Sequence, residues 1–314
     1  MRLTAAIDRY IAHRQAMGES ATSTGRRLRH FARRVGRMRA LDSISLIEVR
    51  AYLDGVRPWT RYWHNKHSTL RGFFRFCVAR EWLAAAPLPV LTPRIAQRFR
   101  PYIYREEEIK RLITLAAEMH TPWTRLEPPT FRLFLLLLYG CGLRMSEALR
   151  LCLSDVRLDE RLLVIRETKF GKTRLVPVGR QIGESLRHYL DTYRRRASLE
   201  PETPLLIFND GHCVRASCAH RAFKRLRARA GIVRHDASPY QPRLRDMRHS
   251  FAVKTLTAWY RSGADVQALL PALSTYLGHT SIAATQVYLT MTPELLALAS
   301  ARFARYAESE KLHE

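Results

Sequence analysis

The chain has 314 residues, enough for two ordinary domains that each bury a core of their own. Its 53 Lys and Arg side chains outnumber 28 Asp and Glu, which gives a formal net charge of +25. Because such a charge makes a compact fold repel itself, it favours a polyanionic partner over a merely solvated basic surface. The longest apolar run, residues 133–139, is too short to cross a bilayer, which argues against a membrane protein.

The first ninety residues show apolar side chains at helical spacing and no strand pattern. Residues 1–100 hold 20 Lys and Arg against 6 Asp and Glu, and every one of these cations except Lys66 is an arginine. Arginine makes forked contacts with phosphate, so this bias favours direct contact with a nucleic-acid backbone. Helices are predicted at 3–17, 23–35, 47–53 and 59–82.

Two of these helices carry informative side chains. The helix at 23–35 places arginines around an apolar face, and four of them are candidates for DNA contact: Arg26, Arg27, Arg33 and Arg34. The helix at 59–82 carries a stripe of large apolar side chains. Because the stripe recurs at the helical period, it is interpreted as core and not as a platform for stacking bases.

A basic, proline-rich segment at 93–104 is predicted to be an extended linker. It separates a helical domain at 1–92 from a second domain at 105–314. The second domain opens on acidic residues at the start of a helix, where the helix dipole favours them. Further predicted elements are a buried helix at 131–139, strands at 161–167 and 174–178, and helices from 182 onward.

The predicted fold is therefore mainly α with a small β-sheet (α+β). A basic helix at 220–229 includes Lys224 and Arg227, which are candidates for contact with phosphates or with the major groove. A solvated helix face is the alternative interpretation. A last helix is predicted after Thr292, with Pro293 at its first position.

Four separated blocks in the second domain carry the residue types that chemistry requires. The first is a Gly-Leu-Arg-Met-Ser-Glu segment, the second a predicted strand hairpin with cations, the third an Arg-Asp-Met-Arg-His segment, and the fourth a Leu-Gly-His followed nine residues later by a tyrosine. Their functional candidates are Arg144 and Glu147; Lys169, Lys172 and Arg174; Arg245, Arg248 and His249; and His279 and Tyr288.

These blocks, in this order and at this spacing, resemble the signature of the tyrosine recombinases, also called phage-type integrases. Any one block has an ordinary structural explanation, such as an i, i+3 helix pair for Arg144 and Glu147. The four together do not. The resemblance covers roughly residues 100–305 by motif, and the helical first domain resembles the core-binding domain of that family. It implies a catalytic domain of mixed α/β type, two domains clamped around double-stranded DNA, and a homo-tetramer that pairs two sites.

The resemblance also implies a role for each motif residue. Arg144 and Arg248 would stabilise the negative charge of the phosphorane, because guanidinium groups are forked and permanently protonated donors. Lys169 would protonate the leaving 5′ oxygen, and His279 would hydrogen-bond the scissile phosphate. Tyr288 would attack and form a 3′-phosphotyrosine that conserves the bond energy. Neither ATP nor any metal or other cofactor is needed for this reaction.

The remaining motif residues receive supporting roles from the same resemblance. Glu147 would orient the first arginine or the neighbouring backbone. Lys172 competes with Lys169 for the role of the acid, although its position fits phosphate contact better, and Arg174 is a further candidate for DNA contact. The helix after Tyr288 would dock on a neighbouring protomer, or it packs on its own domain.

One position departs from the family pattern. The third block begins with Arg245 where the family has a histidine, and arginine cannot accept a proton near neutral pH. It can still donate to a phosphate oxygen, and its charge is expected to lower the pKa of Tyr288. His249 is not expected to replace the missing base, because the next residue along a helix points about 100° away.

Other features concern location and competing functions. Five cysteines at scattered positions predict reduced thiols in a cytoplasmic protein. Binding to DNA would make that protein nucleoid-associated. The His and Cys residues within 212–220 match no common zinc spacing, so no metal site is predicted. Two other functions compete with recombination: a type IB topoisomerase, and a DNA-binding accessory factor that lost catalysis at Arg245.

Overall fold

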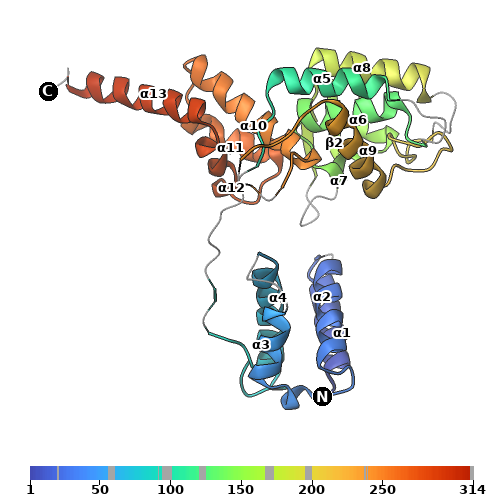
Figure 1. The fold of residues 1–314 in the computed structure, drawn as a ribbon, viewed down its shortest axis with the longest axis vertical. Helices are drawn as coiled ribbons and strands as arrows, with labels where there is room; N and C mark the ends of the chain where they lie inside the picture. The colour runs from blue at the N-terminus through green and yellow to red at the C-terminus, as the bar shows by residue number, and fades with distance from the viewer. Residues whose placement is uncertain are drawn as a thin grey trace. The chain divides into compact units, whose positions relative to one another are not determined.

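The computed structural model describes residues 1–19, 21–55, 61–90, 92–93, 101–119, 125–166, 173–194, 200–236, 238 and 240–311. Over these residues the fold is mainly helical with one three-stranded antiparallel sheet, so the predicted fold class is confirmed (Figure 1). Within the same ranges, no helix is both long and apolar enough to cross a membrane. The helices up to α4 form one compact unit, and all elements from α5 onward belong to the other.

The first unit packs its helices around an aromatic core. Phe31 from α2 and Phe73 and Phe74 from α4 are fully buried, with their rings in edge-on or tilted contact. The apolar stripe of α4 is therefore core, as its period predicted. The elements are α1 (Leu3–Ala16), α2 (Thr22–Val35), the 3-10 helix η1 (Leu41–Ser43), α3 (Leu46–Asp54) and α4 (Arg61–Ala79).

Local chemistry fixes both ends of α3. At its start, the Ser45 side chain accepts from the Glu48 backbone N–H while Glu48 accepts from the Ser45 N–H, which forms a capping box. At its end, the buried Lys66 ammonium donates to the carbonyl oxygens of Tyr52, at 2.6 Å, and of Leu53. A cation at this end of a helix meets the negative pole of the dipole, which offsets part of the cost of burying the ammonium group; burial lowers the pKa of Lys66.

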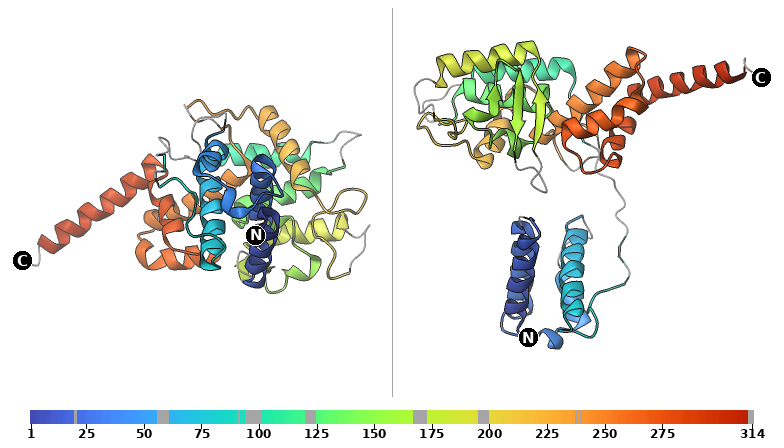
Figure 2. Two further views of the ribbon diagram at one scale, coloured as in Figure 1. Left: turned by 90° about the horizontal axis from the view of Figure 1, so that it is seen from below. Right: turned by 180° about the vertical axis from the view of Figure 1, so that it is seen from behind.

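The second unit holds the sheet. Strand β2 lies between β1 and β3, with Leu163 opposite Val176 and Ile165 opposite Arg174 (Figure 2). Leu163 and Val176 are fully buried against the helical core. The first elements of this unit are α5 (Glu106–Ala117), α6 (Pro128–Gly140), α7 (Met145–Ala148), the 3-10 helix η2 (Leu153–Asp155), β1 (Val156–Arg157), β2 (Leu162–Ile165) and β3 (Arg174–Pro177).

Helices complete the second unit. They are α8 (Arg180–Thr192), α9 (Ala216–Arg229), α10 (Leu244–Arg261), α11 (Val266–Leu277), α12 (Ala283–Gln286), the 3-10 helix η4 (Val287–Thr290) and α13 (Pro293–Lys311). Residues 161, 166 and 178 were predicted as strand ends but lie outside β2 and β3, and residue 167 is not among the described residues. Helix α9 begins four residues before its predicted start. The sequence did not predict α7 or β1, and it did not separate α12 from the helices expected after 182, because a periodic pattern needs more residues than these elements contain.

The last helix begins as its cap residues predicted. The hydroxyl oxygen of Thr292 accepts from the backbone N–H of Leu295 at 3.2 Å, and Pro293 is the first helical residue. Leu295 is fully buried in the apolar cluster formed with α10 and α11. The first turn of α13 therefore packs on its own domain, while its ribbon continues outward beyond the rest of the second unit (Figures 1 and 2).

Candidate active site

The candidate active site lies where two apolar clusters of the second unit meet, and α10 crosses this junction. Leu244 in its first turn is buried in the larger cluster with α6 and the sheet, whereas Val253 and Leu256 are buried in the smaller one with α11. Between these anchors the helix carries Arg248 and His249. Because both ends are held by packing, the middle of α10 has a defined position.

A single carboxylate gathers three arginines at this junction. Glu147 accepts from Arg144 at 2.7 Å and from Arg174 at 3.0 Å and 2.8 Å, and one guanidinium nitrogen of Arg248 lies 3.8 Å from it. The Glu147 side chain is only 3% exposed, and those of Arg174 and Arg248 are 10% and 8% exposed. Arg144 is 37% exposed, so it is the arginine of this group most open to an incoming anion.

The charges of this group are fixed at neutral pH. Burial raises the pKa of Glu147, but the hydrogen bonds from Arg174 and Arg144 have the larger effect and bring it down to about 2. Burial and the neighbouring Arg144 lower the pKa of Arg248 to about 10, which leaves it protonated at neutral pH. Three guanidinium charges and one carboxylate therefore leave a surplus of positive charge, which suits a site for a phosphate.

Backbone carbonyl oxygens also accept hydrogen bonds from the three arginines. These carbonyls belong to the Gly-Leu-Arg segment and to the end of α11, so the contacts join two of the sequence blocks. A second Arg248 nitrogen also donates to the Leu277 carbonyl. The principal carbonyl partners are Gly278 for Arg144, Gly142 for Arg248 and Tyr276 for Arg174, each at 2.8 Å.

Two glycines allow this close packing. Gly142 has a φ of +59°, and a Cβ added there would lie 2.5 Å from the Phe251 ring. Gly278 has a φ of +64°, and a Cβ there would lie 2.9 Å from the Arg174 guanidinium. Both positions need the left-handed backbone and lack room for a side chain, which explains the glycine in two of the four blocks.

Tyr288 lies among the histidines of the site. Its side chain is on η4 and is 4% exposed, with its hydroxyl 3.2 Å from Nδ1 of His249. The His279 ring stacks on the Tyr288 ring at 6.0 Å between centroids, and Nδ1 of His279 lies 2.8 Å from the Thr285 hydroxyl. The third block, with Arg248 and His249, and the fourth, with His279 and Tyr288, thus meet in one place.

Burial sets the protonation of the three aromatic groups. It raises the pKa of Tyr288, and the charges of Arg248 and Arg144 oppose this rise. It lowers the pKa of His249 to about 4, with Arg245 adding to the effect, and lowers the pKa of His279 to about 4, with Arg248 adding to it. Both histidines are therefore neutral at pH 7.

These histidine shifts predict a loss of stability in acid. The unfolded chain binds protons near pH 6.5 and the folded chain near pH 4, so stability falls as the pH drops from 7 to 4. His249 is expected to contribute a loss of about 2 kcal/mol at pH 5. Urea unfolding at pH 7 and pH 5 measures it. His249→Gln should reduce the difference in the free energy of unfolding between pH 7 and pH 5, whereas the control, His188→Gln at an exposed position, should leave it unchanged. The same difference in both variants would contradict the prediction.

The structure changes two expectations about the third block. The pKa of Tyr288 is raised and not lowered, and the cations that oppose the rise are Arg248 and Arg144, while Arg245 is exposed. His249 was not expected to replace the missing base, because its direction was taken relative to Arg248. The relevant reference is Arg245, four residues earlier, because residues one turn apart lie on the same helix face.

Arg174 has a different environment from the one that the sequence predicted. It was predicted to contact DNA, but its side chain is buried and bonded to Glu147 and to the Tyr276 carbonyl. The sequence could not show this, because the arginine and its partners are 27 and 102 residues apart. The roles of Thr285 and of the α11 carbonyl groups were missed for the same reason. The predicted cations Lys169 and Lys172 lie outside the described residues.

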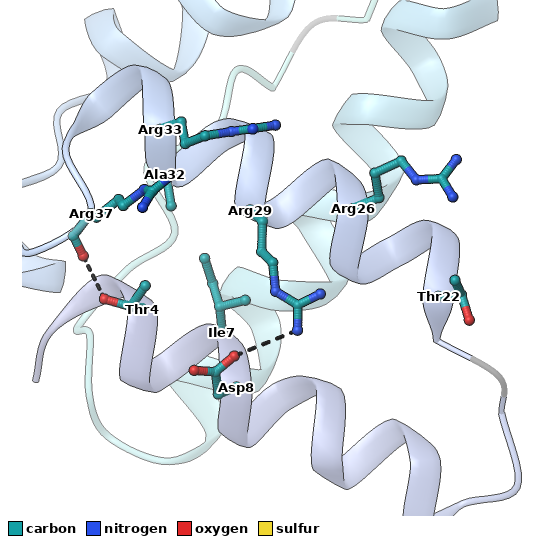
Figure 3. A pocket seen from close by; sticks show the side chains of 9 residues that line it. All are labelled: Thr4, Ile7, Asp8, Thr22, Arg26, Arg29, Ala32, Arg33 and Arg37. Atoms are coloured by element: carbon teal, nitrogen blue, oxygen red, sulfur yellow. Dashed lines mark hydrogen bonds and ion pairs between the residues drawn. The ribbon is translucent and has the colours of Figure 1, made fainter.

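The other DNA-contact candidates divide by exposure. Arg26, Arg33 and Arg34 in α2 and Lys224 in α9 are exposed. Arg26 and Arg33 line a groove of about 470 Å³ between α1 and α2 (Figure 3). The two partly buried candidates bond within the protein: Arg27 donates to the Thr69 hydroxyl at 2.7 Å, and Arg227 donates to the Pro242 carbonyl at 3.0 Å.

Solved structures of recombinases share this fold. The transposon Tn1549 integrase, solved in complex with a circular intermediate DNA, is 17% identical with a TM-score of 0.70, over 98% of this chain and 99% of that one. A lambda integrase dimer bound to a COC′ core site is 19% identical with a TM-score of 0.63, over 90% of this chain and 97% of that one. At these identities the likeness is one of fold.

Sequence comparison gives the family. Residues 103–294 match the model of the phage integrase family. The integrase/recombinase y4rB of Sinorhizobium fredii is 37% identical over 306 residues, which is 96% of each chain. The tyrosine recombinase XerD of Brucella abortus is 30% identical over 94% of this chain and 96% of its own. The chain therefore belongs to the phage integrase family of tyrosine-type, site-specific DNA recombinases, which are enzymes.

Proposed function

We propose that this enzyme cleaves and rejoins double-stranded DNA through a 3′-phosphotyrosyl bond to Tyr288, without a metal ion or ATP. The observation that carries the proposal is the meeting of Arg144, Arg248, His279 and Tyr288 at one junction of the second unit. These are the residues that the family motif assigns to phosphate binding and attack.

The arginines supply the charge that the transition state needs. Attack on a phosphodiester adds negative charge to the non-bridging oxygens, and forked guanidinium donors stabilise it without a metal. Arg144 and Arg248 are held from behind by Glu147 and by backbone carbonyls, so their geometry exists before the phosphate arrives. Catalysis by such preorganised donors needs no rearrangement at the moment of reaction.

The charge distribution supports DNA as the substrate. The net charge of +25 is large, and exposed cations occur in both units, including Arg26 and Arg33 in the first and Lys224 in the second. Phosphate contacts of this kind make affinity strongly dependent on salt. We propose that both units contact one duplex, that 93–104 is the linker between them, and that Lys169 supplies the acid.

The assembly in this proposal is a homo-tetramer on two paired DNA sites. The lambda integrase structure is that of a dimer on DNA, which supports association of protomers in this fold. Exchange of strands between two duplexes needs two cleavages in each, and one Tyr288 in each protomer supplies one cleavage. The enzyme would act in the cytoplasm on the nucleoid.

Trapping the covalent intermediate tests the proposal. A nicked substrate that loses a short strand on cleavage should accumulate a protein–DNA adduct in EDTA and without ATP. Tryptic digestion and mass spectrometry should place the bound nucleotide on Tyr288. DNA binding without any adduct would support the accessory-factor alternative. Relaxation of plasmid that lacks a specific site would support the topoisomerase alternative.

A further inference from the structure

We propose that His249 accepts the proton of Tyr288 during cleavage and returns it during rejoining, in the place of the motif histidine that this chain lacks. The proposal rests on the proposed function and assigns the base for that reaction. It stands on the contact between Nδ1 of His249 and the Tyr288 hydroxyl, at 3.2 Å.

The geometry of this contact fits a proton transfer. The two rings are inclined by 52° with their centroids 5.6 Å apart, so they are not stacked face to face, and the close approach is between Nδ1 and the hydroxyl. A distance of 3.2 Å is at the outer limit for a general base before substrate tightens the site. His249 is half-buried and Tyr288 is buried, so little water competes for this hydrogen bond.

Helix geometry explains how His249 can act in place of a histidine at position 245. His249 follows Arg245 by four residues, which is an advance of about 6 Å along the helix and about 40° around it. The side chain at 249 therefore lies one turn further along the same face. With an arginine at 245, no base is available at that turn of the helix, and His249 supplies a base from the next turn.

Other described side chains near Tyr288 are engaged or unsuited. The ring of His279 lies against the Tyr288 ring at 21°, and its Nδ1 already pairs with Thr285. Glu147 is bonded to Arg144 and Arg174, and its pKa of about 2 makes it a poor proton acceptor. Among the residues that the structure describes, His249 is the proton acceptor in hydrogen-bond contact with the nucleophile.

The charges around His249 support a neutral ring before the reaction. On its own helix it faces Arg243, Arg245, Asp246 and Arg248, and from other elements it faces Tyr288 and His279. Burial lowers its pKa to about 4, with the arginines adding to the effect and the charge of Asp246 opposing it. The phosphorane gains negative charge in the transition state, which favours an imidazolium at that moment.

The proposed step balances. The bond from the Tyr288 oxygen to its proton breaks, the proton moves to Nδ1 of His249, and the oxygen forms a bond to the scissile phosphorus. The bond from phosphorus to the 5′ oxygen breaks, and the general acid, for which Lys169 is proposed, protonates that oxygen. In rejoining, the 5′ hydroxyl attacks phosphorus and gives its proton back to the general acid, which cleavage left deprotonated. The bond from phosphorus to the Tyr288 oxygen breaks, and the His249 imidazolium returns its proton to that oxygen.

Single-turnover adduct formation across pH tests the proposal. His249→Asn keeps a hydrogen-bond acceptor near the hydroxyl but takes no proton. We expect its rate at pH 7 to fall about 10²- to 10⁴-fold, the usual contribution of a general base. Its rate should then climb about tenfold per pH unit up to pH 9, because hydroxide must remove the proton. The wild-type rate should stay nearly constant between pH 6 and 9.

Chemical rescue separates a base from a positioning residue. His249→Ala should regain adduct formation with added imidazole, in proportion to the free-base concentration, while DNA binding stays unchanged. The exposed His188→Asn is the matched control and should keep the wild-type profile. A wild-type rate in His249→Asn, or a reduced rate with a flat profile and no rescue, would overturn the proposal. Because wild type must form the adduct first, failure of the proposed function is a distinct outcome.

Discussion

Tyr288→Phe is expected to abolish the covalent protein–DNA adduct while leaving DNA binding intact. The change removes the oxygen that would attack phosphorus, and loss of a nucleophile lowers turnover on the order of 10⁴-fold or more. The ring still fits the apolar cluster with α10 and α11, so the fold should lose only about 1 kcal/mol with the hydrogen bond to His249.

The matched control for this variant is Tyr276→Phe. Tyr276 is also partly buried in the second unit, and its ring stacks on Phe251 at 5.5 Å. Its contact with Arg174 is made by the backbone carbonyl, which the substitution leaves in place. Adduct yield on the nicked substrate should stay near wild type in this control. An adduct formed by Tyr288→Phe would show that another residue is the nucleophile.

Glu147→Ala is expected to unfold more readily than any surface variant. It would leave Arg174 and Arg248 nearly buried without their counter-charge, and breaking a buried ion pair costs about 3 to 5 kcal/mol. Urea unfolding at pH 7 gives the change in the free energy of unfolding. Cleavage should fall with it, because Arg144 and Arg248 lose the group that aims them.

Two comparisons sharpen this result. Glu106→Ala removes a carboxylate that pairs with Lys110 and Lys254 at the surface, and it should cost less than about 1 kcal/mol. The pKa of Glu147 is lowered to about 2, so its contribution is complete above about pH 4.5 and is lost as the pH falls through 2. The two variants should therefore differ at pH 7 and converge in strong acid. Equal losses at pH 7 would contradict the assigned role of Glu147.

The sequence predicted those features that depend on neighbours in the chain. The four helices of the first unit, the main strands and the Arg144–Glu147 pair follow from periodicity and local spacing. The family motif then supplied the grouping of distant blocks. Neither source revealed that Arg174 is buried in the site, since that depends on how β3 packs on α11. Spacing along one helix also could not show that His249 contacts Tyr288, because the two residues are 39 positions apart in the chain.

The gathering of three arginines on Glu147 has a consequence for how the site can change over evolution. Arg144, Arg174 and Arg248 share one carboxylate, so the effect of replacing any one of them depends on the other two. If Glu147 is replaced first, the intermediate protein has buried arginines without a counter-charge. If an arginine is replaced first, the Glu147 carboxylate loses one of its partners. Single steps away from this set are therefore costly, and related sequences should keep or lose these four residues as a unit.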